Sequence, residues 1–322
     1  MSNVETAPEE VVCGGDDAAA ELVTPRDVPL GGPRAMTVRR TLPRRTRSLI
    51  GAWCFLDHYG PDRVADTGGM AVPGHPHTGL ATVSWLFTGE VEHRDTTGAH
   101  AVVRPGELNL MTAGSGIAHS EFSTPGTEVL HGVQLWLALP AAHRDTPPRF
   151  EHYAPPRVRA GDAALRVFLG SLAGSSSPVE TFTPLLGAEV VLPAGTTVTL
   201  DVDAAFEHGV LVDTGAARVC GTAAASAELV YLPPGRTTLD LHAGDDGARL
   251  VLLGGEPWGE QIVMWWNFVG STHDEIAAFR EQWQDERATG GRDGGRFGVF
   301  PDAWESTLPA PELPNARLTP RG

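Results

Sequence analysis

Cysteine is scarce in this chain. Only Cys13, Cys54 and Cys220 occur among its 322 residues, and they lie far apart in the sequence. An odd, scattered set provides neither a disulfide framework nor a Cys-x-x-Cys metal pair. We therefore expect a protein of the reducing cytoplasm.

Signals for export and for membrane insertion are also missing. The first residues, MSNVETAPEE, are acidic, whereas a secretory signal begins with basic residues and continues with apolar ones. No apolar run approaches the ~18 residues of a membrane-spanning helix. We expect neither a signal peptide nor a membrane anchor.

Basic residues are outnumbered. The chain has 24 Lys and Arg against 40 Asp and Glu, a formal net charge of −16. Because nucleic acids and anionic membranes are bound by basic surfaces, we expect no direct contact with either. We interpret the one local exception as a solvated strand face paired with carboxylates; it comprises Arg39, Arg40, Arg44, Arg45 and Arg47.

Several familiar catalytic signatures are absent. There is no GxSxG elbow, no Walker loop and no paired-carboxylate motif. The run Gly114-Ser115-Gly116 leads to His119 and not to the third glycine of a dinucleotide-binding loop. These absences leave a metal ion as the main candidate for chemistry.

Short strand-like runs fill most of the chain. TVRRTL, SWLFTGEVEHRD, HAVVRPGELNLMT and LHGVQLWLAL are rich in β-branched and aromatic residues and are separated by turn residues. A Pro-rich segment, residues 140–156, interrupts them, and similar runs then resume. We expect an all-β fold of two barrel domains, residues 31–150 and 151–322, after a flexible extension at 1–30.

One helix is predicted near the end, over residues 272–289. Thr272 and Glu275 have the spacing of a capping box, and Gly290-Gly291 ends the run. The apolar residues Ile276, Phe279 and Trp283 recur on one helical face, which we interpret as core packing. A Pro-rich tail follows and is expected to lie on the surface.

The segment 74–122 carries the predicted site. His75 and His77 form one i, i+2 pair, and His119 and Glu121 form another. Alternate side chains of a strand point to the same face, so two such strands would direct four ligands to one point inside a barrel. Imidazoles with a carboxylate suit iron, copper, nickel or zinc. The pattern leaves octahedral and tetrahedral coordination both open.

The surroundings of the four ligands are less well defined. If the first ligand strand stays regular, its inward face also carries Ala81, Val83, Trp85 and Phe87, either as an apolar pocket for a flat organic ligand or as core only. His131 faces away from Gln134 and Trp136, so only one of those faces can line the cavity. We expect structural or surface roles for the other histidines: His58, His93, His100, His143, His152, His208, His242 and His273.

The sequence resembles the pirin family of double-cupin proteins over most of its length. The resemblance rests on FLDHYGP (55–61), GHPHTGLATVSWLFTGEVEHRD (74–95), RPGELNLMTAGSGIAHSE (104–121) and HGVQLWLALP (131–140). It implies tandem cupin β-barrels, a metal-free C-terminal cupin, and an N-terminal cupin that binds one divalent metal through His75, His77, His119 and Glu121. Fe(II) is the metal that it implies first, with Cu, Ni, Zn or Mn as alternatives.

Two functions follow from the resemblance. One is a dioxygenase similar to quercetin 2,3-dioxygenase, acting on a flavonol or catechol-like molecule, with Glu121 as ligand and catalytic base. The other is a metal-responsive or redox-responsive regulator that binds a transcription factor or a metabolic enzyme. A third reading gives the ion a purely structural role. We expect a monomer.

The chain departs from the family pattern at three places. Thr78 and Ala81 stand where members usually have Arg and Glu, and Trp266-Asn267 stands where they have Gly-Pro. The pirin pattern takes its carboxylate ligand from the second motif, so metal binding should survive. Catalytic activity is more sensitive to these changes, because altered hydrogen bonding around metal ligands lowers metal affinity or activity ~10 to 100-fold.

Overall fold

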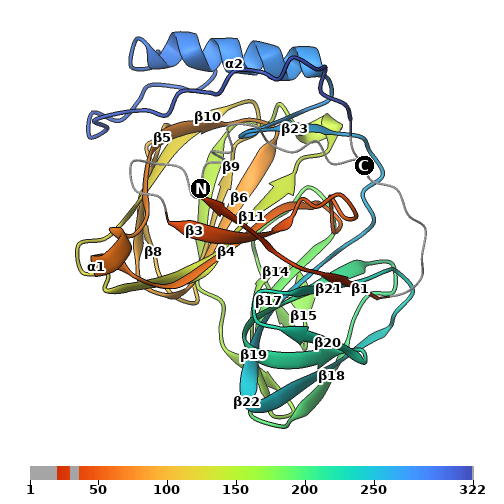
Figure 1. Cartoon of the computed structure of the whole chain (residues 1–322). Helices are drawn as coiled ribbons and strands as arrows, with labels where there is room; N and C mark the ends of the chain where they lie inside the picture. Colours follow the sequence, from red (N-terminus) through yellow and green to blue (C-terminus); the bar gives the residue numbers. More distant parts are fainter. Residues whose placement is uncertain (1–19, 30–35, 321–322) are drawn as a thin grey trace.

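The computed structural model describes residues 20–29 and 36–320, and these form two β-barrels joined side by side (Figure 1). Strands dominate, as expected for tandem cupin domains. Cys54 and Cys220 are free thiols, while Cys13 lies outside the described residues. Neither described α-helix has the length and apolar character needed to cross a bilayer.

The first barrel consists of a seven-stranded and a four-stranded sheet. The larger sheet runs in the order β12 (Arg149–Tyr153), β9 (Leu108–Thr112), β6 (Leu80–Thr88), β11 (Val129–Ala138), β4 (Trp53–Arg63), β3 (Thr37–Leu42) and β2 (Arg26–Pro29). The smaller sheet runs β5 (Ala71–His77), β10 (Ile117–Ser123), β7 (Val91–Asp95) and β8 (His100–Val103). A short helix α1 (Val64–Thr67) follows β4.

The second barrel is built from one nine-stranded sheet. Its order is β1 (Glu21–Val23), β21 (Leu229–Leu232), β19 (Glu207–Val219), β22 (Thr238–Gly255), β17 (Leu185–Leu192), β14 (Ala163–Leu169) and β13 (Val158–Ala160), with β18 (Thr197–Asp201) beside β22 and β20 (Thr222–Ala225) beside β19. Two small hairpins complete the strands: β15 (Ser171–Leu172) with β16 (Ser175–Ser176), and β23 (Val263–Trp265) with β24 (Phe268–Gly270). Aliphatic side chains fill this barrel.

The predicted N-terminal extension is partly structured. Residues 1–19 lie outside the described ones, but β1 pairs with β21 of the second barrel and β2 pairs with β3 of the first. The expectation of a flexible segment up to residue 30 is therefore wrong for residues 21–29. Backbone pairing to existing sheet edges orders these strands although their sequence lacks a periodic apolar pattern.

The Pro-rich segment 140–156 is not only a connection. After a 3-10 turn, η1 (Ala141–His143), it forms β12, which pairs with β9 and extends the sheet of the first barrel. Its prolines flank this edge strand rather than interrupting it, which preserves the hydrogen-bonding N–H groups.

The predicted helix is present as α2 (His273–Arg287), with Thr272 as its N-cap. The capping box is formed, since Glu275 N donates to Thr272 Oγ1 at 3.2 Å and the Glu275 carboxylate accepts from the Thr272 backbone N–H. Ile276 and Trp283 are buried, as the periodicity predicts. Their partners include Ala118 of β10, so α2 covers the first barrel and not the second (Figure 1).

The C-terminal tail also holds the edge strand β5. Gly74 forms a parallel bridge with Thr307, and the Leu308 N–H donates to the Gly74 carbonyl at 2.8 Å. At its other end, the Val269 N–H donates to the Thr78 carbonyl at 3.0 Å. A Cβ at Gly74 would lie 2.4 Å from the Trp304 ring, so only glycine permits this approach.

The barrels meet through the outer faces of their large sheets. Trp85 of β6 contacts Phe168 of β14, with ring centroids 4.6 Å apart, and both side chains are fully buried. The Trp53 indole N–H donates to the Gly254 carbonyl at 3.1 Å. This sheet-on-sheet contact forms a second hydrophobic core shared by both domains.

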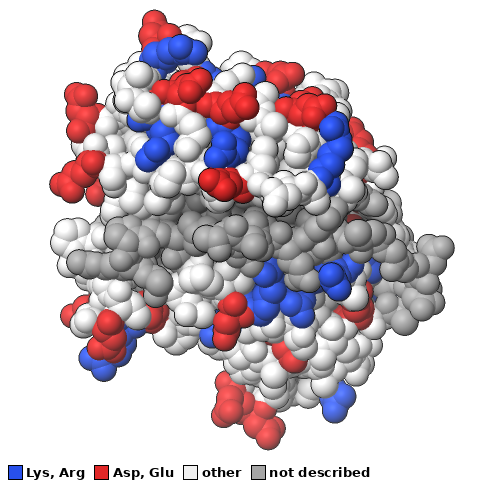
Figure 2. Space-filling view, turned by 45° about the horizontal axis from the view of Figure 1, so that its top comes forward, with Lys and Arg blue, Asp and Glu red and all other residues white. Residues whose placement is uncertain are grey.

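The arginine run of β3 and the following loop contributes to this architecture. Arg40 is buried and paired with Asp57, so the expectation of a solvated face is wrong at this position, although pairing with carboxylates is confirmed. Arg47 is paired with Glu21 at 3.3 Å. On the face drawn in Figure 2, basic side chains lie among acidic ones and form no continuous basic surface.

Candidate metal centre

Neighbouring antiparallel strands carry the predicted ligands. His75 and His77 lie on β5, and His119 and Glu121 lie on β10. His75 is directly opposite His119 in the ladder, and the register shifts by one residue between His119 and Glu121. The i, i+2 spacing of each pair thus places the side chains on the interior face, where all four are buried.

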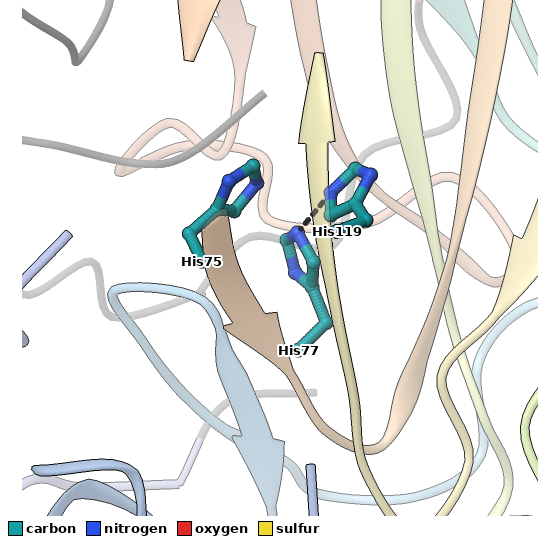
Figure 3. A group of neighbouring side chains, drawn as sticks. All are labelled: His75, His77 and His119. Carbon is teal, nitrogen blue, oxygen red and sulfur yellow. Dashed lines mark hydrogen bonds between the residues drawn. The ribbon is translucent and has the colours of Figure 1, made fainter. Parts of the chain in front are cut away.

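Three imidazoles converge on one point (Figure 3). The ligand nitrogens of His75, His77 and His119 all lie within 4.8 Å of one another, and the Nε2 atoms of His77 and His119 are 3.1 Å apart. Two nitrogens that bind the same ion at ~2.0–2.1 Å are separated by roughly 2.9–3.4 Å. The spacing therefore fits a shared cation.

The protonation of His75 supports the same conclusion. Its Nδ1 lies 2.9 Å from the Pro73 carbonyl, which can only accept, so Nδ1 carries the proton. The Nε2 lone pair is then buried, and it has no hydrogen-bond partner among the described residues. Burial lowers the pKa of His75 to about 3, so the ring stays neutral. A neutral imidazole with a buried, unpaired lone pair is suited to a metal ion.

His77 and His119 are kept neutral by the same cause. Burial is the main effect that lowers the pKa of each ring well below the ordinary value, and the neighbouring imidazoles add to it. Both rings are therefore neutral at neutral pH, so each has one nitrogen with a lone pair that a metal ion can bind.

Glu121 belongs to a second, overlapping group. Its carboxylate and ligand nitrogens of His93 and His119 also lie within 4.8 Å of one another. The structure thus places the four predicted residues in two triads that share His119, and it adds His93 to them. Ser84 Oγ lies 3.4 Å from Glu121 Oε1 and 2.9 Å from Gln134 Oε1, so the carboxylate also contacts a polar side of the barrel.

His93 is the residue that the sequence analysis missed. Its Nε2 lies 3.0 Å from Asp95 Oδ2, so it donates there, and its Nδ1 faces His119 Nδ1 at 3.3 Å. Burial raises the pKa of Asp95, but hydrogen bonds from His93 and Thr97 outweigh it, and the carboxylate stays ionised. His119 Nδ1 therefore donates to His93, and His119 Nε2 keeps its lone pair for a metal. The His-x-Asp spacing of residues 93 and 95 was the available signal.

Comparison with known proteins agrees with this architecture. The sequence matches the families described as Pirin, over residues 35–137, and Pirin C-terminal cupin domain, over residues 187–289. The chain belongs to the pirin family.

Several pirins and related solved structures are similar to this chain along most of its length. A Pseudomonas aeruginosa protein named "Putative quercetin 2,3-dioxygenase" is 44% identical over 290 residues, which cover 88% of this chain and 91% of that protein. A "Pirin-like protein" of Caulobacter vibrioides is 34% identical, covering 78% and 88% of the two chains. The crystal structure of a quercetin 2,3-dioxygenase from Acinetobacter baumannii has a TM-score of 0.85 at 36% identity, covering 92% of this chain and 96% of that one.

The structure decides between the two roles, pocket wall or core, that the sequence left open for the apolar residues of β6 beside this pirin site. Ala81, Val83 and Trp85 point away from the site and belong to the core between the two barrels. The first ligand strand does not stay regular, because β5 ends at His77 and a turn with Gly79 at φ +67° starts a new strand with the opposite alternation. The site side of β6 instead carries Ser84.

Aromatic rings close another side of the pirin site. The edge of Trp136 contacts the His77 ring at 5.2 Å between centroids, and Trp136 stacks on Phe55 at 3.9 Å. Gln134 and Trp136 therefore line the cavity, while His131, on the opposite face of β11, contacts Asp213 of the second barrel. The expected opposition of these two faces is confirmed.

The pirin departure at Ala81 has little bearing on the ligands. Because this side chain faces the second barrel, the absence of a glutamate there removes no group from the neighbourhood of His75 or His77. Alanine at this position is therefore compatible with an intact set of metal ligands.

Replacing His93 with phenylalanine should weaken metal binding ~10 to 100-fold, the usual effect of losing a hydrogen-bond partner of a ligating histidine. Phenylalanine keeps the ring packing against Phe150 but removes the acceptor for His119 Nδ1. Competition against a coloured chelator would measure the affinity. His100→Phe, an exposed position on β8, is the matched control, and equal affinities in both variants would contradict the assignment.

Proposed function

We propose that this pirin is a metal-dependent dioxygenase-type oxidoreductase that acts on a flavonol-like or catechol-like molecule. The observation that carries the proposal is the buried, unpaired Nε2 lone pair of His75, directed at the same point as the nitrogens of His77 and His119. His75, His77, His119 and Glu121 would hold the ion. The resemblance to pirins implies Fe(II) first, and the donor set also suits Cu, Ni, Zn or Mn.

The substrate class is supported by the surroundings of the ligands and by the relatives. Trp136 places an apolar ring beside His77, and Ser84 and Gln134 place hydrogen-bonding groups beside Glu121 that suit the hydroxyl groups of an aromatic compound. The Pseudomonas aeruginosa relative and the Acinetobacter baumannii structure described above both carry quercetin 2,3-dioxygenase in their names. A planar polyhydroxylated aromatic compound fits both observations.

Residues of this chain would bind the ion, accept a proton and orient a ligand. A bound divalent ion supplies a Lewis acid that favours the ionised form of a substrate hydroxyl. Glu121 accepts the proton of that hydroxyl, because it is the carboxylate in the ligand cluster. Asp95 and His93 hold the His119 ring in orientation, and all three imidazoles that would bind the ion are buried.

Oxygen uptake with quercetin tests this proposal. Protein loaded separately with iron, copper or nickel should consume oxygen with at least one metal, and His119→Ala should lower the rate more than ~100-fold. His242→Ala is a matched control, since that imidazole is exposed on the second barrel and bonded to Thr197. No uptake with any metal, or equal uptake by His119→Ala, would remove the enzymatic proposal for this substrate.

A further inference from the structure

A second cluster of ligand-type side chains lies at the edge of the contact between the two barrels. It consists of His58 on β4, His131 on β11 and Asp213 on β19, and all three are buried. Two strands of the first domain and one of the second thus supply one group each. None of the three belongs to the site described above.

The ligand atoms converge closely. Asp213 Oδ1 lies 2.7 Å from His58 Nε2 and 2.6 Å from His131 Nε2, and the two nitrogens are 3.4 Å apart. Two imidazole nitrogens bound tetrahedrally to one zinc ion are separated by roughly 3.3 Å. The nitrogens therefore already have the required spacing, and the carboxylate oxygen needs to move away from them by about 0.8 Å.

We propose that His58, His131 and Asp213 form a second divalent metal site, of the zinc class, that joins the two barrels. Two imidazoles and one carboxylate are a ligand set that zinc accepts, with water in the fourth position. In the metal-free cluster, both imidazoles direct Nε2 at the same carboxylate oxygen. When a divalent ion binds at the point where the three atoms meet, each neutral imidazole would carry its proton on Nδ1 instead, which leaves both Nε2 lone pairs for the ion.

The protonation states suit metal binding. Burial lowers the pKa of His58, which keeps this ring neutral. Burial raises the pKa of Asp213, but hydrogen bonds from His131 and His58 outweigh it and bring the pKa to about 2. An ionised carboxylate therefore faces a neutral imidazole at neutral pH.

Two arginines flank the cluster, one beside the carboxylate and one beside an imidazole. Arg249 Nη1 lies 3.2 Å from Asp213 Oδ2, so it orients the carboxylate and leaves Oδ1 for the ion, while Glu189 at 3.5 Å balances its charge. Arg39 Nη2 lies 3.4 Å from His58 Nε2, where its positive charge opposes a cation. Arg39 is only half-buried and also donates to the Gly60 carbonyl, so it can be replaced without opening the core.

The position of the cluster between the barrels gives the ion a structural role. Because its ligands come from both domains, binding requires that the barrels be docked, and the ion stabilises the docked state in proportion to its occupancy. Unlike the candidate centre in the first barrel, this site is assigned no substrate.

Counting bound Zn²⁺ in the full-length protein tests the proposal. Chelator-treated protein dialysed against Zn²⁺ should retain two ions per wild-type chain, with one fewer in Asp213→Asn and one fewer in His119→Ala. Asparagine preserves the shape of the side chain, and His131→Gln serves as a second variant if Asp213→Asn does not fold. Equal counts in wild type and in the folded variants at positions 213 or 131 would overturn the proposal.

The Zn²⁺ affinity of an Arg39 variant provides a second, independent test. Arg39→Gln should tighten Zn²⁺ binding at this site about tenfold, because it removes a like charge a few ångströms from the ion. A cluster that only forms hydrogen bonds would show no such change, and that result would count against the site. If the first-barrel centre fails, wild type and His119→Ala both bind one ion while Asp213→Asn binds none, so the two proposals are separable.

Discussion

Replacing His119 with alanine is expected to lower the affinity of the first-barrel centre for a divalent ion more than ~100-fold. His119 is the residue shared by both ligand triads, and its Nε2 lies 3.1 Å from His77 Nε2. Loss of an outer hydrogen-bond partner alone costs ~10 to 100-fold, and removal of a ligand should cost more. Elemental analysis of protein purified without chelators would show one ion fewer per chain.

The control variant must lack an imidazole that lies far from the first-barrel centre. His242→Ala meets this condition, because His242 lies on β22 of the second barrel and its ring is exposed and bonded to Thr197. Circular dichroism of both variants would establish that they fold. Wild-type metal content in folded His119→Ala would show that the converging imidazoles bind no ion.

Replacing Arg40 with alanine is expected to lower the free energy of unfolding by about 3–5 kcal/mol. Arg40 Nε lies 2.7 Å from Asp57 Oδ1, and Nη2 lies 2.8 Å from Oδ2, with both side chains almost fully buried. The guanidinium also lies over the Phe55 ring at 4.3 Å. The variant leaves the Asp57 carboxylate buried without this partner, which costs more than the pair itself contributes.

Denaturant unfolding of wild type and variant would measure this loss. Arg63→Ala is the matched control, because Arg63 and Asp66 are both exposed and 3.8 Å apart. An exposed pair of this kind contributes less than about 1 kcal/mol. If Arg40→Ala were no more destabilising than Arg63→Ala, the burial of the Arg40–Asp57 pair would have no energetic consequence.

Local patterns were the most predictable part of this protein. The capping box at Thr272 and the stripe of Ile276 and Trp283 identified α2, because both depend only on residues within one helix. The spacing of His75 and His77 likewise identified an inward-facing pair, because alternation along one strand fixes which side chains share a face.

Prediction failed where the outcome depends on how strands are joined. The role of the apolar residues of β6 stayed open in the sequence, because it depends on whether the alternation continues past Gly79, and the turn there reverses it. His58 and Asp213 are separated by 155 positions in the sequence, and only the docking of the two barrels brings them together. His93 could have been recognised, since its spacing from Asp95 is the same as that of the predicted ligand pairs.

The attachment of the C-terminal tail to β5 has a consequence for folding during synthesis. β5 lies at the edge of its sheet; its Gly74 carbonyl accepts from Leu308, and the Thr78 carbonyl just beyond its end accepts from Val269. During synthesis, the strand that carries His75 and His77 therefore lacks these partners until nearly the whole chain has left the ribosome. Metal acquisition by the first barrel should accordingly be a late, post-translational event, and loss of the last few dozen residues should impair it although every ligand remains.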